Sequence, residues 1–364
     1  MGVILVTSLH NGDGKTAFCA GLALLLEQQG RKPALIKPLT AGDPAEDPDA
    51  RFFRRISGAS LPVGLPRPSV VAERDLTPEA RVQIAGAVAQ ASSPFKEAPE
   101  GLPSPQGSPV IVEGPSLVSS DGAPSPVLVF QGSPRGASLS GQLAEALDAR
   151  VVLLVQPSPT LQASQVEEAA RSLGTRLLGI VLNGVRRYQR HGIETDLVTP
   201  LRAAGLAVLA LVPEDRHLLA VTIADIARGL NAQFLLLEEK QDQLVDHLVI
   251  GGNVLDWGVH YFSQYESKAV IVRGDRPDIQ VAALHTPTRC LVLTGGHQPL
   301  QYVRYEAQEE AVPLLLAQAS TLDTARAAEA LLARATVHHR EKAERYAQLL
   351  RESLDLATVL SALG

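Results

Sequence analysis

The chain has 364 residues, 45% of them hydrophobic and 20% charged, which allows two globular domains and excludes a fibrous or wholly disordered protein. Its formal net charge of −6 leaves no basic footprint for nucleic acid or an anionic membrane surface. The apolar runs are far shorter than the roughly 20 residues of a membrane span and the N-terminus shows no secretory signal pattern, so we expect a cytoplasmic protein without nucleic-acid or membrane partners.

The chain opens as strand, loop, helix and strand, which is the start of a βαβ unit. Residues 3–7 are mostly β-branched, 17–28 are rich in helix formers and 33–36 are again apolar. The alternation continues and predicts an α/β fold, a doubly wound parallel sheet with its functional loops at the carboxyl ends of the strands. The later strands are expected at 110–112, 127–130, 151–155, 177–182 and 206–211, and helices at 138–147, 160–173 and 199–204.

The loop after the first strand carries Gly12-Asp13-Gly14-Lys15-Thr16 and opens the first helix. In this context backbone N–H groups and the helix N-terminus face phosphate oxygens, the lysine reaches the terminal phosphates and the threonine hydroxyl reaches Mg²⁺. Leu9 stands where the usual pattern has its first glycine. We predict a site for ATP and Mg²⁺; the alternative is an ordinary β–α turn with an exposed lysine. The expected nucleotide-binding residues are His10, Asn11, Gly12, Asp13, Gly14, Lys15, Thr16 and Ala17.

Carboxylates follow two later strands, at the positions where they could bind the Mg²⁺ of a nucleotide site. An acidic cluster at 46–49 comes after the second strand, and Glu113 follows the strand at 110–112. Because Mg²⁺ prefers one or two carboxylates together with phosphate, we expect Thr16, Asp47 and Glu113 to be metal ligands. The alternatives are a solvated acidic turn and a charge that merely emerges from the sheet.

Asn183 ends the strand at 177–182. Its side-chain amide can both donate to and accept from an adenine edge. We expect it to contact the base, and a capping or turn residue would look the same.

A second, smaller α/β region follows the polar stretch 238–243, with strands expected at 269–272, 290–293 and 312–316 and helices at 279–283 and 325–332. Gly274 and the Gly295-Gly296 pair follow two of these strands and permit close backbone approach to a ligand or another chain. Neighbouring acidic and basic residues either bind an anion or form an ion pair that only fixes the loop.

The end of the chain, 341–363, has apolar residues at helical spacing, so we expect one or two helices packed on a domain face or a partner. His338 and His339 have no companion ligands and are expected to be exposed to solvent. Cys19 and Cys290 lie in apolar segments and are expected to be buried thiols.

The order of the first motifs resembles the dethiobiotin synthetase and cobyrinate synthetase branch of the P-loop proteins. The matching segments are 7–16, 36–38 with 40–42, 112–114, 180–185 and 211–213. Segment 274–279 followed by 293–296 resembles the signature of the DRTGG domain, and the two together are similar to the N-terminal region of the long bacterial phosphate acetyltransferases. The loop residues that carry the second resemblance are Asp275, Arg276, Asp278, Thr294, Gly295 and Gly296.

The resemblance implies a P-loop nucleotide-binding domain at 1–240, a DRTGG domain at 245–335 and a C-terminal helical segment at 336–364. It also implies a regulatory protein that senses a nucleotide or a small-molecule effector, hydrolyses ATP slowly at most and forms a homodimer, with a separate acetyltransferase chain as a further candidate partner. Because the sequence ends at Gly364, we expect no acetyltransferase activity from it.

The alternative function is that of an ATP-dependent ligase of the dethiobiotin synthetase type, acting on a small carboxylate or amine. Lys37 matches a lysine that contacts substrate in that family, although it also persists in relatives that are not synthetases. The candidate catalytic residues are Lys15, Lys37 and Glu113.

Overall fold

The computed structural model describes residues 2–40, 43, 45–57, 65–66, 71–72, 75–92, 109–117, 138–252 and 255–364. The chain forms two compact units, the first made of Met1–Glu214 with Val337–Gly364 and the second of Asp215–Thr336. The boundary therefore lies before the predicted one at 240–245, because segment 223–236 joins the core and the sheet of the second unit. The predicted C-terminal segment 336–364 belongs to the first unit, apart from its first residue.

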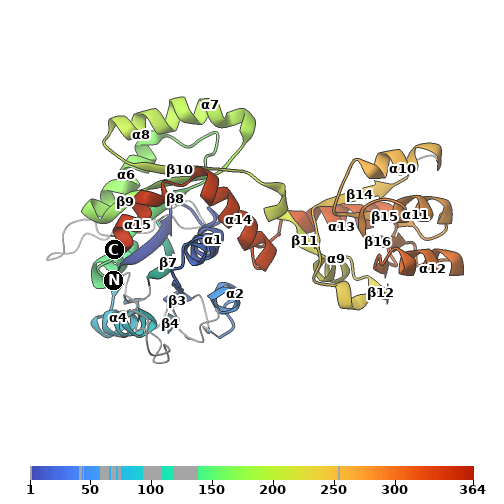
Figure 1. Cartoon of the computed structure of the whole chain (residues 1–364), viewed down its shortest axis with the longest axis horizontal. Coiled ribbons are helices and arrows are strands. Elements are labelled where there is room, and N and C mark those ends of the chain that lie inside the picture. The colour runs from blue at the N-terminus through green and yellow to red at the C-terminus, as the bar shows by residue number, and fades with distance from the viewer. Residues whose placement is uncertain are drawn as a thin grey trace. The chain divides into compact units, whose positions relative to one another are not determined.

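The first unit is built on a six-stranded sheet in the order β10-β9-β8-β1-β7-β2, with every neighbouring pair parallel (Figure 1). Most residues of these strands are aliphatic and buried, as in parallel strands covered by helices on both faces. The predicted parallel α/β sheet is thus confirmed. The six strands are β1 (Val3–Ser8), β2 (Ala34–Ile36), β7 (Val110–Ser116), β8 (Arg150–Val155), β9 (Leu177–Val185) and β10 (Val208–Pro213).

Helices cover both faces of this sheet. On one face, apolar side chains of α4, α5, α6 and α8 share a core with Leu5, Val112 and Leu153. On the other face α1 packs against α14 so closely that a Cβ on Gly21 would lie 2.7 Å from Cδ1 of Tyr346. The helices are α1 (Lys15–Gln28), α2 (Pro48–Ser57), α4 (Pro78–Ser92), α5 (Leu139–Ala146), α6 (Ala163–Leu173), α7 (Arg190–Ile193), α8 (Thr199–Ala203), α14 (Arg340–Ser353) and α15 (Leu356–Leu363).

Several of these elements differ from the sequence-based prediction. Helices α2, α4 and α7 were not predicted, whereas the expected C-terminal helices are confirmed as α14 and α15. Strand β7 continues to Ser116 beyond its expected end at 112. The expected strand at 127–130 lies outside the described residues. Four short strands complete the unit, namely β3 (Leu39–Thr40), β4 (Leu65–Pro66), β5 (Val71–Ala72) and β6 (Asp75–Leu76).

The second unit has a five-stranded sheet in the order β12-β17-β16-β15-β14, in which only the pair β12 and β17 is antiparallel. Apolar residues of α10, α11 and α12 form one core, and those of α9 and α13 form another. The predicted smaller α/β region is confirmed. Its elements are β11 (Val221–Thr222), α9 (Ile223–Gly229), β12 (Gln233–Leu236), β13 (Leu244–Val245), β14 (His247–Gly251), α10 (Leu255–Ser263), β15 (Lys268–Arg273), α11 (Pro277–Leu284), β16 (Thr288–Thr294), α12 (Gln301–Glu309), β17 (Leu314–Leu316) and α13 (Thr321–Leu332).

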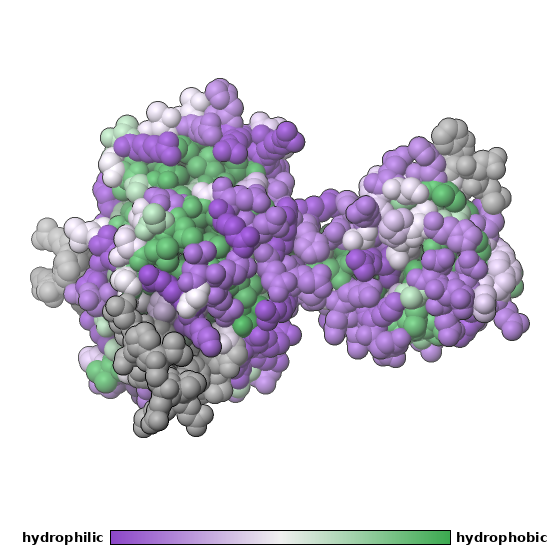
Figure 2. Space-filling model, viewed as in Figure 1, coloured by the Kyte–Doolittle hydropathy of each residue, from purple (hydrophilic) through white to green (hydrophobic). Residues whose placement is uncertain are grey.

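The apolar residues are largely inside these cores. Figure 2 shows a surface that is mostly hydrophilic in this view, with scattered apolar patches. Cys19 and Cys290 are both buried free thiols, as expected. Among the helices in the described part of the chain, none combines the length and apolar character needed to cross a membrane.

Candidate functional site

Side chains of the loop between β1 and α1 hold that loop in place by hydrogen bonds within it. Asp13 is buried, and its Oδ2 accepts a hydrogen bond of 2.8 Å from the backbone N–H of His10. Lys15 Nζ donates to Ser8 Oγ at 3.0 Å, and that hydroxyl donates to the carbonyl of His10 at 2.7 Å. Burial raises the pKa of Asp13 and lowers that of Lys15. Lys15 is half-buried, so the alternative of an ordinary turn with an exposed lysine does not describe this loop.

The glycines of the loop have the backbone freedom that its shape requires. Gly12 and Gly14 have φ values of 91° and 95°, in the left-handed region that side chains disfavour. The position of Leu9 does not require a glycine. Its side chain is buried, and its N–H donates to the carbonyl of Leu154 at 2.9 Å, which continues the pairing of β1 with β8. This explains the departure from the usual phosphate-loop pattern. Of the remaining predicted residues, His10 and Asn11 are exposed, Thr16 is half-buried and Ala17 is buried in α1.

Glu113 lies at the centre of the site because of the strand order. Strand β7 is flanked by β1 and β2, and Glu113 is paired with Val6 while Val112 is paired with Ile36. Side chains alternate along a strand, so Glu113 points to the face covered by α1, where Thr16 hydrogen-bonds to it. Burial and the nearby charge of Asp49 raise the pKa of Glu113 to about 7.

Lys37, the residue after β2, is held by three carboxylates. Its Nζ lies 3.1 Å from Oδ2 of Asp47 and 4.0 Å from Oε1 of Glu113, and it also forms an ion pair with Asp49. Burial alone would lower the pKa of Lys37, but the charges of Glu113, Asp49 and Asp47 raise it above its usual value. Burial alone would likewise raise the pKa of Asp49, whereas hydrogen bonds from His338 and Lys37 hold it below its usual range.

Two of the three predicted metal ligands come together. Thr16 and Glu113 are in contact, and Oε2 of Glu113 is buried without a hydrogen-bond donor among the described residues. A hydroxyl beside an unpartnered carboxylate oxygen fits the oxygen ligands of Mg²⁺. Asp47 is instead directed to Lys37 and to the start of α2. No cluster of three or more His, Cys, Asp or Glu side chains in the described parts of the chain could hold a metal ion by itself.

Asp47 caps helix α2. Its Oδ1 accepts hydrogen bonds of 3.0 Å from the backbone N–H groups of Asp49 and Ala50. We expect Asp47→Ala to lower the free energy of unfolding by about 1–2 kcal/mol, since it removes a helix cap and one carboxylate from a half-buried lysine. Chemical denaturation would measure the loss. The matched control is Asp43→Ala, which removes an exposed carboxylate that accepts a hydrogen bond from the N–H of Ala45; an equal loss in both variants would contradict the capping role.

Asn183 holds the phosphate loop to the C-terminal helix. Its Nδ2 donates to the carbonyl of Asp13 at 2.8 Å, and its Oδ1 accepts from the hydroxyl of Tyr346 at 2.7 Å. A side chain on Gly14 would clash with the same amide. In this structure both polar ends of Asn183 are therefore used inside the protein, and its contact with a base stays a prediction.

His338 is not the solvent-exposed side chain that we expected. Its side chain is 20% exposed, its Nε2 lies 2.7 Å from Oδ1 of Asp49, and its ring packs edge-on against Phe52 with the centroids 5.5 Å apart. His339 is half-buried and its Nδ1 accepts from the N–H of Glu341, at the start of α14. The expectation was wrong because it rested only on the lack of companion metal ligands. The partners of His338 are Asp49 and Phe52, which are distant in the sequence, and His339 contacts the start of its own helix.

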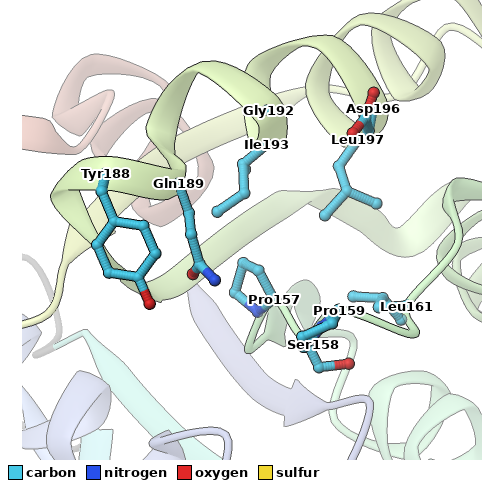
Figure 3. A pocket seen from close by; sticks show the side chains of 10 residues that line it. All are labelled: Pro157, Ser158, Pro159, Leu161, Tyr188, Gln189, Gly192, Ile193, Asp196 and Leu197. Carbon is cyan, nitrogen blue, oxygen red and sulfur yellow. The ribbon is translucent and has the colours of Figure 1, made fainter.

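A pocket lies at the same edge of the sheet as the phosphate loop, since it follows the carboxyl ends of β8 and β9 (Figure 3). The side chains of Ile193 and Leu197 point toward the loop that carries Pro157 and Pro159, and that of Gln189 extends toward the same loop. No sequence motif marks these residues. The full lining is Pro157, Ser158, Pro159, Leu161, Tyr188, Gln189, Gly192, Ile193, Asp196 and Leu197.

The loops of the second unit are joined to each other. Arg276 pairs with Asp278 at 2.7 Å and Asp275 pairs with Arg273. The backbone N–H groups of Gly295 and Gly296 donate to the carbonyls of Ala319 and Ala317, and the hydroxyl of Thr294 lies 2.7 Å from that of Thr321. The ion pairs, one of the two predicted alternatives, are present. The approach of a ligand or another chain to the glycines stays a prediction.

Comparison with known proteins agrees with both units. The AAA domain family matches residues 3–222. The chain belongs to this family. In this AAA-domain protein the DRTGG domain family matches residues 225–331, which confirms the resemblance stated from the motifs.

Two curated relatives of this AAA-domain protein belong to the protein families that the motifs resemble. A phosphate acetyltransferase of Deinococcus radiodurans is 27% identical over 349 residues, 89% of this chain and 46% of the relative. An ATP-dependent dethiobiotin synthetase of Mycobacterium leprae is 34% identical over 114 residues, 31% of this chain and 48% of the relative. The chain thus spans about half the length of the curated relatives it matches.

Among solved structures, cobyrinic acid a,c-diamide synthase from Mycobacterium smegmatis, with a bound ATP analogue and magnesium, is 15% identical to this AAA-domain protein. The similarity covers 59% of this chain and 88% of the other, with a TM-score of 0.36.

Proposed function

We propose that the first unit binds ATP together with Mg²⁺ at the loop between β1 and α1. The observation that carries the proposal is the buried Oε2 of Glu113, which lacks a donor among the described residues and lies on a carboxylate hydrogen-bonded to Thr16. A bound Mg²⁺ would supply charge neutralisation for the phosphates, with Thr16 and Glu113 as the residues that hold it. Lys15 and the N-terminus of α1 would bind the phosphate oxygens.

We further propose that the nucleotide is a regulatory signal and is hydrolysed slowly at most. The similarity to phosphate acetyltransferase and the presence of a DRTGG region support this role, as does the return of the chain to the first unit after the second. The second unit would then bind a small-molecule effector or a second copy of the chain.

Thermal unfolding of the full chain with a series of nucleotides tests the proposal. Mg·ATP at about 100 times its Kd would add roughly 2.7 kcal/mol to the free energy of unfolding, a rise of a few degrees in Tm. Inorganic phosphate with Mg²⁺ is the control, and it should have a much smaller effect. An unchanged Tm at millimolar Mg·ATP would count against the proposed function.

A further inference from the structure

The segment that follows the second unit enters the candidate nucleotide site at two points. The chain leaves the first unit at Glu214 and rejoins it at Val337, and we call residues 337–364 the return segment. His338 of this segment contacts Asp49, and Tyr346 contacts Asn183. Asn183 binds the phosphate loop, and Asp49 binds Lys37. The return segment is therefore connected to both sides of the site.

His338 is fixed in place at its ring and at its backbone. Its ring packs on Phe52 of α2, and its carbonyl accepts a hydrogen bond of 3.3 Å from Nη2 of Arg55 on the same helix. The Nε2 of the ring then meets Asp49 at 2.7 Å, within normal hydrogen-bond length. A side chain held at both ends can set the orientation of the group that it contacts.

The carboxylate of Asp49 is divided between two partners. Oδ1 faces His338, whereas Oδ2 forms the ion pair with Lys37. Because the two oxygens turn together, the contact at Oδ1 determines where Oδ2 lies. Lys37 in turn lies 4.0 Å from the carboxylate of Glu113, which contacts Thr16 of the phosphate loop. The contacts thus run from His338 through Asp49 and Lys37 to Glu113.

We propose that His338 is a positioning residue for Lys37. It holds Asp49 in the orientation that keeps the ammonium of Lys37 beside Glu113, so the site of the first unit is complete only when the return segment is docked. What Lys37 then faces, the phosphates of a Mg²⁺-bound nucleotide, rests on the proposed function. The position of Lys37 itself does not depend on that function, and the two can be tested separately.

The first test measures the reactivity of Lys37 without nucleotide. Full-length wild type, His338→Ala and His338→Gln would be treated briefly with a lysine-selective acylating reagent, and acylation of Lys37 would be followed by peptide mass spectrometry. We expect Lys37 to react several times faster in His338→Ala, because its ammonium would no longer be held beside the carboxylates of Asp49 and Glu113. His338→Gln keeps an N–H donor for Asp49 and should restore most of the wild-type rate.

The matched control is His285→Ala. His285 also lies 2.7 Å from a carboxylate, that of Glu306, and both residues belong to the second unit. Lys37 in this variant should react at the wild-type rate. An unchanged rate in folded His338→Ala would overturn the proposal, and so would equal rates in the Ala and Gln variants, because His338 would then act only by packing on Phe52.

The second test measures the affinity of the same variants for Mg·ATP. If the proposed function holds, His338→Ala should bind about fivefold more weakly than wild type, and His338→Gln should bind nearly as well as wild type. Equal binding by wild type and His338→Ala would overturn the link between Lys37 and the nucleotide. If wild type itself does not bind Mg·ATP, the proposed function fails, while the acylation rates still decide whether His338 positions Lys37.

Discussion

Replacing Lys15 with alanine is expected to weaken the binding of Mg·ATP about 10- to 100-fold, the loss of roughly 1.5–3 kcal/mol that removal of a charged hydrogen-bond donor from an anion causes. In the structure Lys15 is half-buried and its Nζ lies on Ser8, inside the loop that would surround the phosphates. Equilibrium dialysis with labelled ATP in excess Mg²⁺ would measure the change.

The control for this experiment is Lys32→Ala. Lys32 is an exposed lysine that follows α1, near the end of that helix opposite to the phosphate loop. Its replacement removes the same charge from the protein but leaves the loop intact. If the two variants bound Mg·ATP equally well, Lys15 would have no special role in phosphate binding.

Replacing Glu113 with glutamine should stabilise the metal-free protein at high pH. Burial raises the pKa of this carboxyl from 4.5 to about 7, so the folded state favours its protonated form. The protonated carboxyl of Glu113 therefore stabilises the folded state. This stabilisation is fully present below about pH 4.5 and is lost as the pH rises through about 7. A neutral glutamine avoids that loss, and we expect it to raise the free energy of unfolding at pH 8 by roughly 2–3 kcal/mol.

Urea unfolding at pH 4.5 and pH 8, with EDTA present, would separate this effect from a general change in packing. Glu113→Gln should be close to wild type at the lower pH and more stable at the higher one. Glu145→Gln changes an exposed glutamate of α5 and should differ little from wild type at either pH. A Glu113→Gln effect of the same size at both pH values would contradict the buried charge.

The parallel sheet could be predicted because its strands carry a local signal. Aliphatic runs such as 151–155 alternate with helices, and this pattern depends on neighbouring residues only. The end of β7 was missed because Glu113-Gly114-Pro115-Ser116 does not look apolar, although these residues complete the strand. The boundary between the units was misplaced because β12 pairs with a strand about 80 residues later, which periodicity cannot show.

The central residues of the candidate site could also be predicted from strand ends. Lys15 and Lys37 follow β1 and β2, and Glu113 lies near the carboxyl end of β7, the strand between them. Because the carboxyl ends of parallel strands meet at one edge of the sheet, the sequence could predict that these residues lie together. The contact between His338 and Asp49 spans 289 residues, and that between Tyr346 and Asn183 spans 163. Such contacts depend on the docking of α14, and no motif or helix face in the sequence indicates them.

The most direct test of the nucleotide site is a calorimetric titration of the full chain with ATP, carried out once with Mg²⁺ and once with EDTA. We predict one Mg·ATP bound per chain, with binding at least about tenfold weaker without the metal, a difference of ~1.4 kcal/mol or more. Absence of binding in both titrations would contradict the central claim that the first unit is a nucleotide site. Equal binding in both would contradict the assignment of Thr16 and Glu113 to Mg²⁺.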